Sequence, residues 1–318
     1  MDLVIWISIL AVALFTLVKS SDIFTQASEQ IGLYFGLSHF VIGATIVAVG
    51  SSMPELATSF ITILSGKKEL LTFPIDNIIG SNIANCLLVG GFTAIAVKVL
   101  KVKEKLIDID LPFFFISSAI FLLFIMDGTF DYREGILSLI LLTIFIWYII
   151  TTEDEEKTVI DKKEKKKKRI LGPKTFIYFI GGMVGIYFAA DYTVSSVLKI
   201  SEILKIQSAI ITMIIVAVGT SLPELIVSIQ AAKKGKHSIA LGNIFGSNTF
   251  NVLAVAGVPS LFGTLEVSTK AASIGIPFFI VATFSFIFTT SDDQIQKWEG
   301  LALLIVYLAF AGKLTGIL

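Results

Sequence analysis

Long apolar stretches separated by short polar connections make up almost the whole chain of 318 residues. A helix crosses a bilayer with roughly 17 to 25 mostly apolar residues. By this measure the sequence predicts about ten spans, and they lie near residues 3–20, 39–65, 76–99, 109–127, 133–151, 174–191, 206–232, 238–262, 271–290 and 297–316. The connections are too short for a second soluble domain, so we expect an all-α polytopic membrane protein.

One connection is long and polar, with the sequence TEDEEKTVIDKKEKKKKRILG at residues 152–172. Its charge density predicts a solvated linker with little fixed structure. Because lysine and arginine gather on the cytoplasmic side of membrane proteins, the run from Lys165 to Arg169 places the linker there. With the N-terminus outside, most of the 25 basic residues then fall in cytoplasmic loops. We expect an integral protein of the plasma membrane.

The composition supports this class and excludes others. The chain is 55% hydrophobic, has a mean hydropathy of +0.87 and is only 16% charged, which is more apolar than a soluble domain needs. Its net charge is zero and its lysines lie in loops, which argues against nucleic-acid binding. Cys86 is the only cysteine, so neither an intrachain disulfide nor a thiol-ligated cluster is possible.

The chain contains two related halves. IVAVGSSMPEL at residues 46–56 matches IVAVGTSLPEL at residues 215–225, and NIIGSNIAN at residues 77–85 matches NIFGSNTFN at residues 243–251. Further matched positions extend the duplication beyond these motifs. We expect the first repeat to cover residues 1–151 and the second to cover residues 173–318, with the charged cytoplasmic linker between them.

Each half holds about five spans, and this odd number means that the second half must enter the membrane from the opposite side. The sequence therefore predicts two inverted-topology repeats of five helices. Inverted repeats with interrupted helices are typical of secondary transporters, whose binding site lies near the membrane midplane between the halves. A duplication without transport is the weaker alternative.

Two prolines interrupt corresponding spans. Pro54 and Pro223 stand directly before Glu55 and Glu224. Proline removes a helical hydrogen bond and clashes with the preceding turn, so both helices should break here. The freed carbonyls must be paired by protein or line a cavity that holds water and ions. We expect them to belong to Ala48, Gly50, Ser51, Ala217, Gly219 and Thr220.

Glu55 and Glu224 lie near the centres of their spans, where an ionised carboxylate facing lipid would cost several kcal/mol. They should therefore face inward, toward a cation. A single glutamate at this depth can also be protonated and hydrogen-bonded. Two glutamates in matching contexts favour the cation.

Further oxygen donors share helix faces around these glutamates. Ser52 and Glu55 are three residues apart, and Ser81 and Asn85 are four apart, spacings that bring side chains together on a helix. The second half repeats the pattern with Ser221, Glu224, Ser247 and Asn251. A set of oxygens without sulfur or imidazole suits calcium or sodium rather than zinc or copper. Two carboxylates would be neutralised by one calcium ion, and monovalent ions could occupy the same oxygens in its place.

The motifs GSSMPE and GTSLPE, each followed by GSNxxN, resemble the paired α-repeats of the sodium/calcium exchanger family, prokaryotic type, within the cation/calcium antiporters. The resemblance covers essentially the whole chain. It implies that Glu55 and Glu224 are central ligands shared by calcium and sodium. It also implies supporting ligands at Ser51, Thr220, Ala48, Ala217, Ser52, Ser81, Ser221 and Ser247, with Asn85 and Asn251 lining the middle site.

By this resemblance the protein is expected to exchange sodium for calcium by alternating access, electrogenically and with no cofactor or obligatory protein partner. Asn251 stands where the potassium-dependent branch and several prokaryotic members carry Asp, which favours potassium independence. Small residues in the first and sixth helices are expected to let these helices slide over the rest, namely Gly32, Gly36, Gly181, Gly182 and Gly185.

Three alternatives stay open. The nearest is a potassium-dependent or proton-coupled calcium antiporter. An intramembrane enzyme with Glu55 and Glu224 as an acid/base pair is disfavoured, because the sequence has no nucleophile-base set, phosphate-binding loop or HExxH motif. A selective channel is the third alternative, and strict counter-transport would exclude it.

Overall fold

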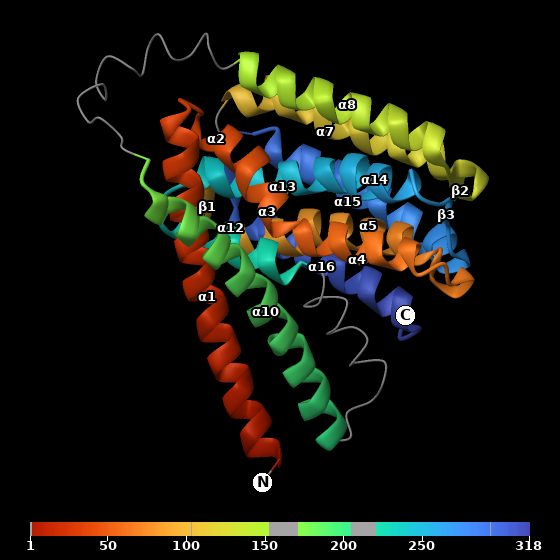
Figure 1. Ribbon diagram of the computed structural model, residues 1–318, viewed down its shortest axis with the longest axis horizontal. Coiled ribbons are helices and arrows are strands. Elements are labelled where there is room, and N and C mark those ends of the chain that lie inside the picture. Colours follow the sequence, from red (N-terminus) through yellow and green to blue (C-terminus); the bar gives the residue numbers. More distant parts are fainter. Residues whose placement is uncertain (1, 103, 153–170, 205–220, 293) are drawn as a thin grey trace.

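The computed structural model of the chain describes residues 2–102, 104–152, 171–204, 221–292 and 294–318 (Figure 1). The first half contains α1 (Asp2–Tyr34), α2 (His39–Ile42), η1 (Gly43–Val47), α3 (Ala48–Ser51), α4 (Met53–Leu64), η2 (Lys68–Leu70), α5 (Phe73–Ile83), η3 (Ala84–Val89), α6 (Gly90–Val97), α7 (Glu104–Phe124), η4 (Ile125–Asp127) and α8 (Tyr132–Thr152). The second half contains α10 (Pro173–Ile203), α12 (Leu222–Lys233), α13 (His237–Phe250), η6 (Asn251–Val255), α14 (Ala256–Ser260), η7 (Ala271–Gly275), α15 (Ile276–Thr290) and α16 (Lys297–Thr315). The segments η1, η3, η6 and η7 are π-helical, whereas η2 and η4 are 3-10 turns.

The predicted all-helical membrane fold is confirmed. Within the described residues, 7 helices are long and apolar enough to cross a membrane, or 8 if the bent pair His39–Ser51 and Met53–Leu64 counts as one span. A shorter apolar helix covers Leu111–Asp127. The predicted span 206–232 is described only from residue 221 onward, as α12.

The predicted first span, residues 3–20, is too short, because α1 continues as one helix to Tyr34. The added part contains polar residues that a hydropathy window rejects. Ser21, Thr25 and Ser28 are nevertheless at most 2% exposed, because other helices cover this face of α1. Hydropathy predicts only the apolar part of a helix that can face lipid, and α1 extends beyond this part because its polar residues are covered by protein.

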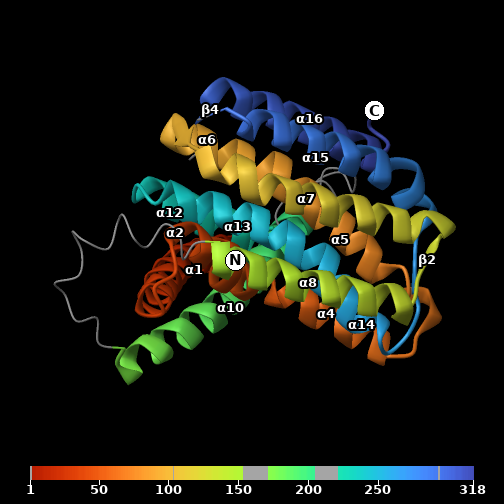
Figure 2. The ribbon, with the colours of Figure 1, turned by 90° about the horizontal axis from the view of Figure 1, so that it is seen from above.

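The two long helices α1 and α10 lie side by side and run antiparallel along one flank of the molecule (Figures 1 and 2). The rings of Phe24 and Phe179 pack 5.2 Å apart. Gly182 allows the close approach, since a Cβ there would lie 2.9 Å from the Cα of Phe24. Gly185 fits against Ser20 in the same way, whereas Gly181 has open space beside it.

The two remaining glycines of the predicted sliding helices have other surroundings. A Cβ on Gly32 would lie 2.2 Å from the Cγ1 of Ile42 in α2, so this glycine allows α1 to approach α2. Gly36 follows the end of α1 with a φ of 76°, a conformation that favours glycine in the turn toward α2.

The centre of the molecule is formed by the continuous helical segments Phe73–Val97 and His237–Ser260. Their most apolar stretches are 83% and 94% buried, against 33% or less for the other long spans. The Asn-containing motifs lie on these two segments. Helix packing on all sides therefore shields the motifs from lipid.

In the described ranges, four short strands join the two halves. β1 (Val99–Lys101) pairs antiparallel with β4 (Gln294–Gln296), and β2 (Thr129–Phe130) pairs antiparallel with β3 (Leu265–Glu266). Figure 2 shows β4 and β2 at opposite ends of the molecule. Each pair combines a strand of one half with a strand of the other, so the halves are held together at both ends.

Candidate cation site

The first helix break lies where Pro54 predicts it. α3 ends at Ser51, Ser52 has a φ of −92° and a ψ of 6°, and α4 starts at Met53 with a change of direction of 43°. Because Pro54 has no N–H group, the carbonyl of Gly50 has no donor four residues ahead. The break at Ser52 therefore places Glu55 in the first turn of α4.

In the second copy of the proline motif, the helix that contains the glutamate begins at the corresponding position. α12 starts at Leu222 with Pro223 in its first turn, and Ser221 before it has a φ of −111° and a ψ of 14°. Two predicted site residues, Ala217 and Thr220, lie outside the described residues.

The carboxylates of Glu55 and Glu224 are both buried, and each lies in the first turn of the helix that follows its proline motif. Glu55 is 4% exposed and Glu224 is 1% exposed. Ser52 Oγ donates a hydrogen bond of 3.1 Å to Oε1 of Glu224 and thereby links the first break to the second carboxylate. The Oε2 atoms of Glu55 and Glu224 have no hydrogen-bond partner among the described residues.

Ser51 connects the first break to α13. Its Oγ lies 3.1 Å from Oδ1 of Asn243, 3.4 Å from Oγ of Ser247 and 3.2 Å from the carbonyl oxygen of Ala48. The Ala48 carbonyl also accepts the N–H of Ser52 at 3.0 Å, so in this structure it has a partner inside the helix. Ser51 and Ser247 are fully buried.

The two GSNxxN motifs end in π-helical turns. Asn251 is the first residue of η6, and Asn85 is the second residue of η3. Single π-helical turns inside α-helices are frequent at functional sites because they redirect side chains. η6 packs against α4, the helix of Glu55, and η3 packs against α12, the helix of Glu224. The π-helical turn of each asparagine thus packs against the helix that carries the glutamate of the other half.

Every described candidate residue is buried, and several of their oxygens are unsatisfied. Buried polar atoms normally have a hydrogen-bond or ion partner, so oxygens that no protein donor contacts are the ones available to coordinate an ion. Among the described residues, the unpartnered oxygens of the candidate set belong to Glu55, Glu224, Ser81, Asn85, Ser221 and Asn251. The contacts bring together residues from both halves into one buried oxygen-rich region.

The charges of this region call for a cation. The described ion pairs involve other acidic residues, and neither Glu55 nor Glu224 takes part in one. No group of three His, Cys, Asp or Glu side chains that could hold a metal occurs in the part of the chain that the structure describes. Two carboxylates surrounded by hydroxyls and amides suit a hard cation.

Two polar residues that were not among the predicted ligands, Asn243 and Asn82, hold this region together. Asn243 Nδ2 donates to Oγ of Ser228 at 3.0 Å and to the carbonyl of Glu224 at 3.5 Å, while its Oδ1 faces Ser51. Asn82 likewise bridges the two halves. The sequence does indicate these residues, because asparagine occurs at the matched positions Asn77/Asn243 and Asn82/Asn248 of the two motifs.

Known proteins resemble the chain over nearly its full length. The family model described as sodium/calcium exchanger protein matches residues 5–151 and 174–315. The sodium/calcium exchanger MaX1 of Methanosarcina acetivorans is 30% identical over 340 residues, covering 95% of this chain and 96% of the relative. The solved sodium/calcium exchanger from Methanococcus jannaschii is 29% identical with a TM-score of 0.76, covering 96% of this chain and 97% of that one. Sodium/potassium/calcium exchanger 3 of Rattus norvegicus is 32% identical over 125 residues, which are 38% of this chain and 20% of that protein.

Proposed function

The chain belongs to the sodium/calcium exchanger family, and we propose from this membership and from the buried oxygen site that it exchanges sodium for calcium across the membrane by alternating access. The observation that carries the proposal is the pair Glu55 and Glu224, both buried and both without a cationic side chain in the described ion pairs, with Ser52 of the first break donating to Glu224. The family is one of transporters, so the chemistry is ion coordination and release.

We propose that the transported ions bind between the two halves. Glu55 and Glu224 would be shared by calcium and sodium, because their two charges balance one calcium ion. Hydroxyl, amide and carbonyl oxygens would complete the coordination, supplied by Ser51, Ser52, Ser81, Asn85, Ser221, Ser247, Asn251 and Ala48, with Thr220 and Ala217 proposed from the sequence repeat alone. Competition for the same carboxylates would make sodium and calcium occupancy mutually exclusive, which is what exchange requires.

The architecture that we propose is ten transmembrane helices in two inverted repeats, residues 1–151 and 173–318, with the cytoplasmic linker 152–172 between them. Three observations support it: the family model matches the two halves as separate segments, π-helical turns occur at corresponding asparagines, and the β1–β4 and β2–β3 pairs join the halves in a symmetric manner. The N-terminus would lie outside the plasma membrane.

We propose that the exchange is electrogenic and independent of potassium. Three sodium ions against one calcium would move one net charge, worth roughly 2.3 kcal/mol per 100 mV. Asn251 supports potassium independence, because its amide is neutral at any pH. A potassium-dependent or proton-coupled antiporter is the second candidate, supported by the partial similarity to the rat sodium/potassium/calcium exchanger.

The decisive experiment is calcium uptake into proteoliposomes driven by an imposed sodium gradient, with potassium and proton gradients as separate arms. We expect uptake to follow the sodium gradient, to change with membrane potential and to be lost in Glu55→Gln. Uptake that ignores sodium and follows potassium or protons would select the second candidate. Coupled flux that is unchanged in Glu55→Gln would refute the site.

A further inference from the structure

Asn82 of α5 contacts the second half at two points near the proposed site. Its Nδ2 donates to the backbone carbonyl of Asn248 at 3.1 Å, and its Oδ1 accepts Nδ2 of Asn251 at 3.0 Å. All three residues are at most 2% exposed. The side chain of Asn82 therefore lies entirely inside the interface between the halves.

The order of these bonds fixes the orientation of the Asn251 amide. A backbone carbonyl can only accept, so the NH₂ group of Asn82 must face Asn248. The oxygen of Asn82 then faces Asn251 and requires the NH₂ group of that residue. The oxygen of Asn251 is consequently turned away from Asn82, and it is buried with no partner among the described residues.

An amide ligand must be held in one orientation to present its oxygen to a cation, whereas a carboxylate presents an oxygen in either orientation. Asparagine presents an acceptor on one side and a donor on the other, and a donor facing a cation would be repulsive. We propose that Asn82 is a positioning residue, which holds Asn251 with its oxygen toward the cation and its NH₂ group away from it. The inference rests on the proposed function of the site and deepens it by explaining how a neutral residue serves as a ligand.

Calcium affinity in a double-mutant cycle tests the proposal. We measure calcium binding to the purified full chain in sodium-free buffer for Asn82→Ala, Asn251→Asp and the double variant. Asn82→Ala should weaken binding about tenfold when residue 251 is Asn, as for other residues that orient metal ligands. In the Asn251→Asp background it should have no effect or tighten binding, because the oxygen of Asn82 would face a carboxylate.

Asn248→Ala is the matched control, because Asn248 holds the corresponding position in the second half, while its Nδ2 bonds the Ile244 carbonyl of its own helix at 2.7 Å. It should change the affinity equally in both backgrounds. An equal loss for Asn82→Ala in both backgrounds, or no loss in either, would overturn the positioning role. A wild-type protein that binds no calcium would overturn the proposed function and this inference together.

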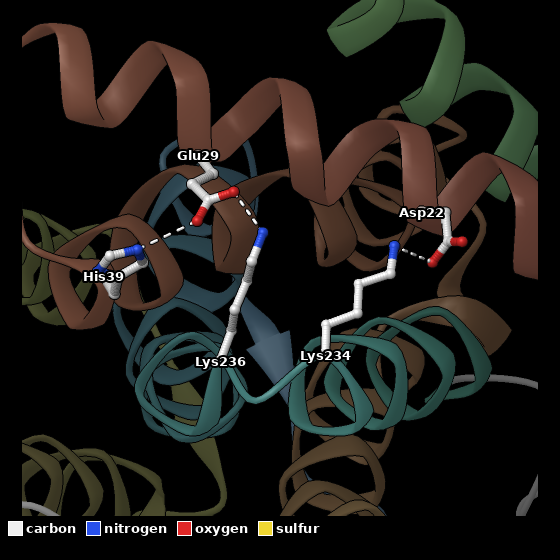
Figure 3. Close-up of polar contacts among 5 residues, drawn as sticks. All are labelled: Asp22, Glu29, His39, Lys234 and Lys236. Carbon is white, nitrogen blue, oxygen red and sulfur yellow. Dashed lines mark hydrogen bonds and ion pairs between the residues drawn. The ribbon is translucent and has the colours of Figure 1, made fainter. Parts of the chain in front are cut away.

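A second, independent feature lies where α1 meets the turn between α12 and α13. Lys236 forms an ion pair with Glu29, which also accepts Nε2 of His39 at 3.1 Å, and Lys234 forms an ion pair with Asp22 at 2.8 Å (Figure 3). These five residues are called the α1 latch below. Figure 3 shows both lysines reaching from the turn to the underside of α1.

The α1 latch lies on the face of the molecule where the linker is attached. Thr175, at the start of α10 and just after the linker, donates through Oγ1 to the side chain of Gln30 at 3.1 Å, next to Glu29. Beneath the latch, the hydroxyls of Ser21, Thr25 and Ser28 are buried and have no partner among the described residues. These hydroxyls have no hydrogen-bond partner in the closed arrangement, so they would gain hydrogen bonds to water if the helices packed on this face of α1 moved away.

The sequence repeat lacks a second latch. Gly66 and Gly235 are related by the same offset as the motif glycines Gly50 and Gly219, and both turns have positive φ, 64° and 76°. By the same offset, Lys234 corresponds to Ser65 and Lys236 corresponds to Lys67. On the long helices, Asp22 corresponds to Asp191 and Glu29 corresponds to Leu198. Neither the pair Asp191 and Ser65 nor the pair Leu198 and Lys67 can form an ion pair.

A cleft of about 200 Å³ lies beside the first helix break at the middle of α10, lined among others by Met53, Pro54, Val184 and Tyr187. We propose that the α1 latch holds α1 closed over Ser21, Thr25 and Ser28 at the linker face, independently of this cleft. In the exchange cycle that the proposed function requires, the latch must break each time the ions reach the linker face.

Thiol accessibility tests the latch without transport. In the purified full chain we place a reporter with Ser28→Cys, and Thr25→Cys serves as a second reporter on the same buried face. Adding Glu29→Gln removes the charge that binds both His39 and Lys236. We expect modification by a charged methanethiosulfonate reagent to become about tenfold faster, because charged hydrogen bonds of this kind shift such equilibria by that order.

Two controls separate opening from unfolding. Glu202→Gln breaks the exposed pair of Lys199 and Glu202 in α10 and should leave the rates unchanged. With Val184→Cys as the reporter in the cleft, Glu29→Gln should leave the rate unchanged. An unchanged rate at positions 28 and 25, or an equal increase at position 184, would overturn the latch whether or not the protein exchanges sodium for calcium.

Discussion

The two proline motifs have nearly the same sequence and different surroundings. Met53 is 37% exposed and Pro54 borders the cleft beside α10, whereas their counterparts Leu222, 5% exposed, and Pro223 are buried. α1 packs closely on α12, while α10 leaves the cleft beside α4. A motif therefore determines where its helix breaks, but the neighbouring long helix determines whether the break can be reached.

This difference is what alternating access would use. If the two breaks are equivalent in the sequence, moving α1 and α10 together could exchange their environments without changing the ligands. The energy difference between the two states then depends on contacts that do not repeat, such as the α1 latch. Substitutions at matched positions of the two halves distinguish contacts that repeat from contacts that do not.

The largest effect should come from the carboxylates, for which we expect the halves to be equivalent. Glu224→Gln should lower sodium-driven calcium uptake at least about 100-fold, a loss beyond that caused by residues that only orient a ligand. Glu55→Gln should have a similar effect, although the two glutamates differ in the exposure of their neighbours. Uptake assays in proteoliposomes measure both, with Glu202→Gln as the control. A loss in only one variant would show that one half alone supplies the essential charge.

A smaller but clear effect should separate the surroundings of the two motifs. Met53→Cys and Leu222→Cys place the same thiol at equivalent positions of the two halves. Because Met53 borders the cleft and Leu222 is buried, the first thiol should react at least about tenfold faster with a charged reagent. Cys86 is buried and should contribute no background. Equal rates would mean that the two breaks are equally accessible in solution.

The sequence was most informative where the physical cause is local. A proline removes its own hydrogen bond wherever it occurs, so the break before Glu55 could be placed correctly from Pro54 alone. A carboxylate in an apolar span must face protein, so the burial of Glu55 and Glu224 followed as well. These inferences required no knowledge of which helices become neighbours.

The sequence was least informative where the cause lies in another part of the chain. The hydrogen bonds of Ser52 with Glu224 and of Asn82 with Asn251 join positions that are far apart in the sequence. The length of α1 depends on helices that cover Ser21 and Ser28, which hydropathy cannot represent. The repeat indicated which residues are equivalent without indicating which of them meet.

Adjacent glycines of α10 test the packing of the long helices. Gly182→Ala would place a Cβ 2.8 to 2.9 Å from the N, Cα and Cβ atoms of Phe24, and a backbone cannot yield as a side-chain end can. We expect a loss of about 2 kcal/mol in the free energy of unfolding, the usual size of overpacking effects. Gly181→Ala has open space and should be neutral or slightly stabilising. Thermal unfolding in detergent measures both, and equal midpoints would mean that α1 and α10 are not closely packed.

The smallest effect should occur at the helix starts that close each half, where the two halves are alike. Glu134 accepts the N–H of Asp131 at 2.8 Å at the start of α8, and Glu299 accepts the N–H of Gln296 at 2.6 Å at the start of α16. Glu134→Ala and Glu299→Ala should each cost about 1 kcal/mol of unfolding free energy, because each leaves an N-terminal N–H group without its acceptor. Similar losses are expected, since neither contact involves α1 or α10. A cost confined to one half would mean that the difference between the halves extends beyond the long helices to the ends that the strand pairs hold together.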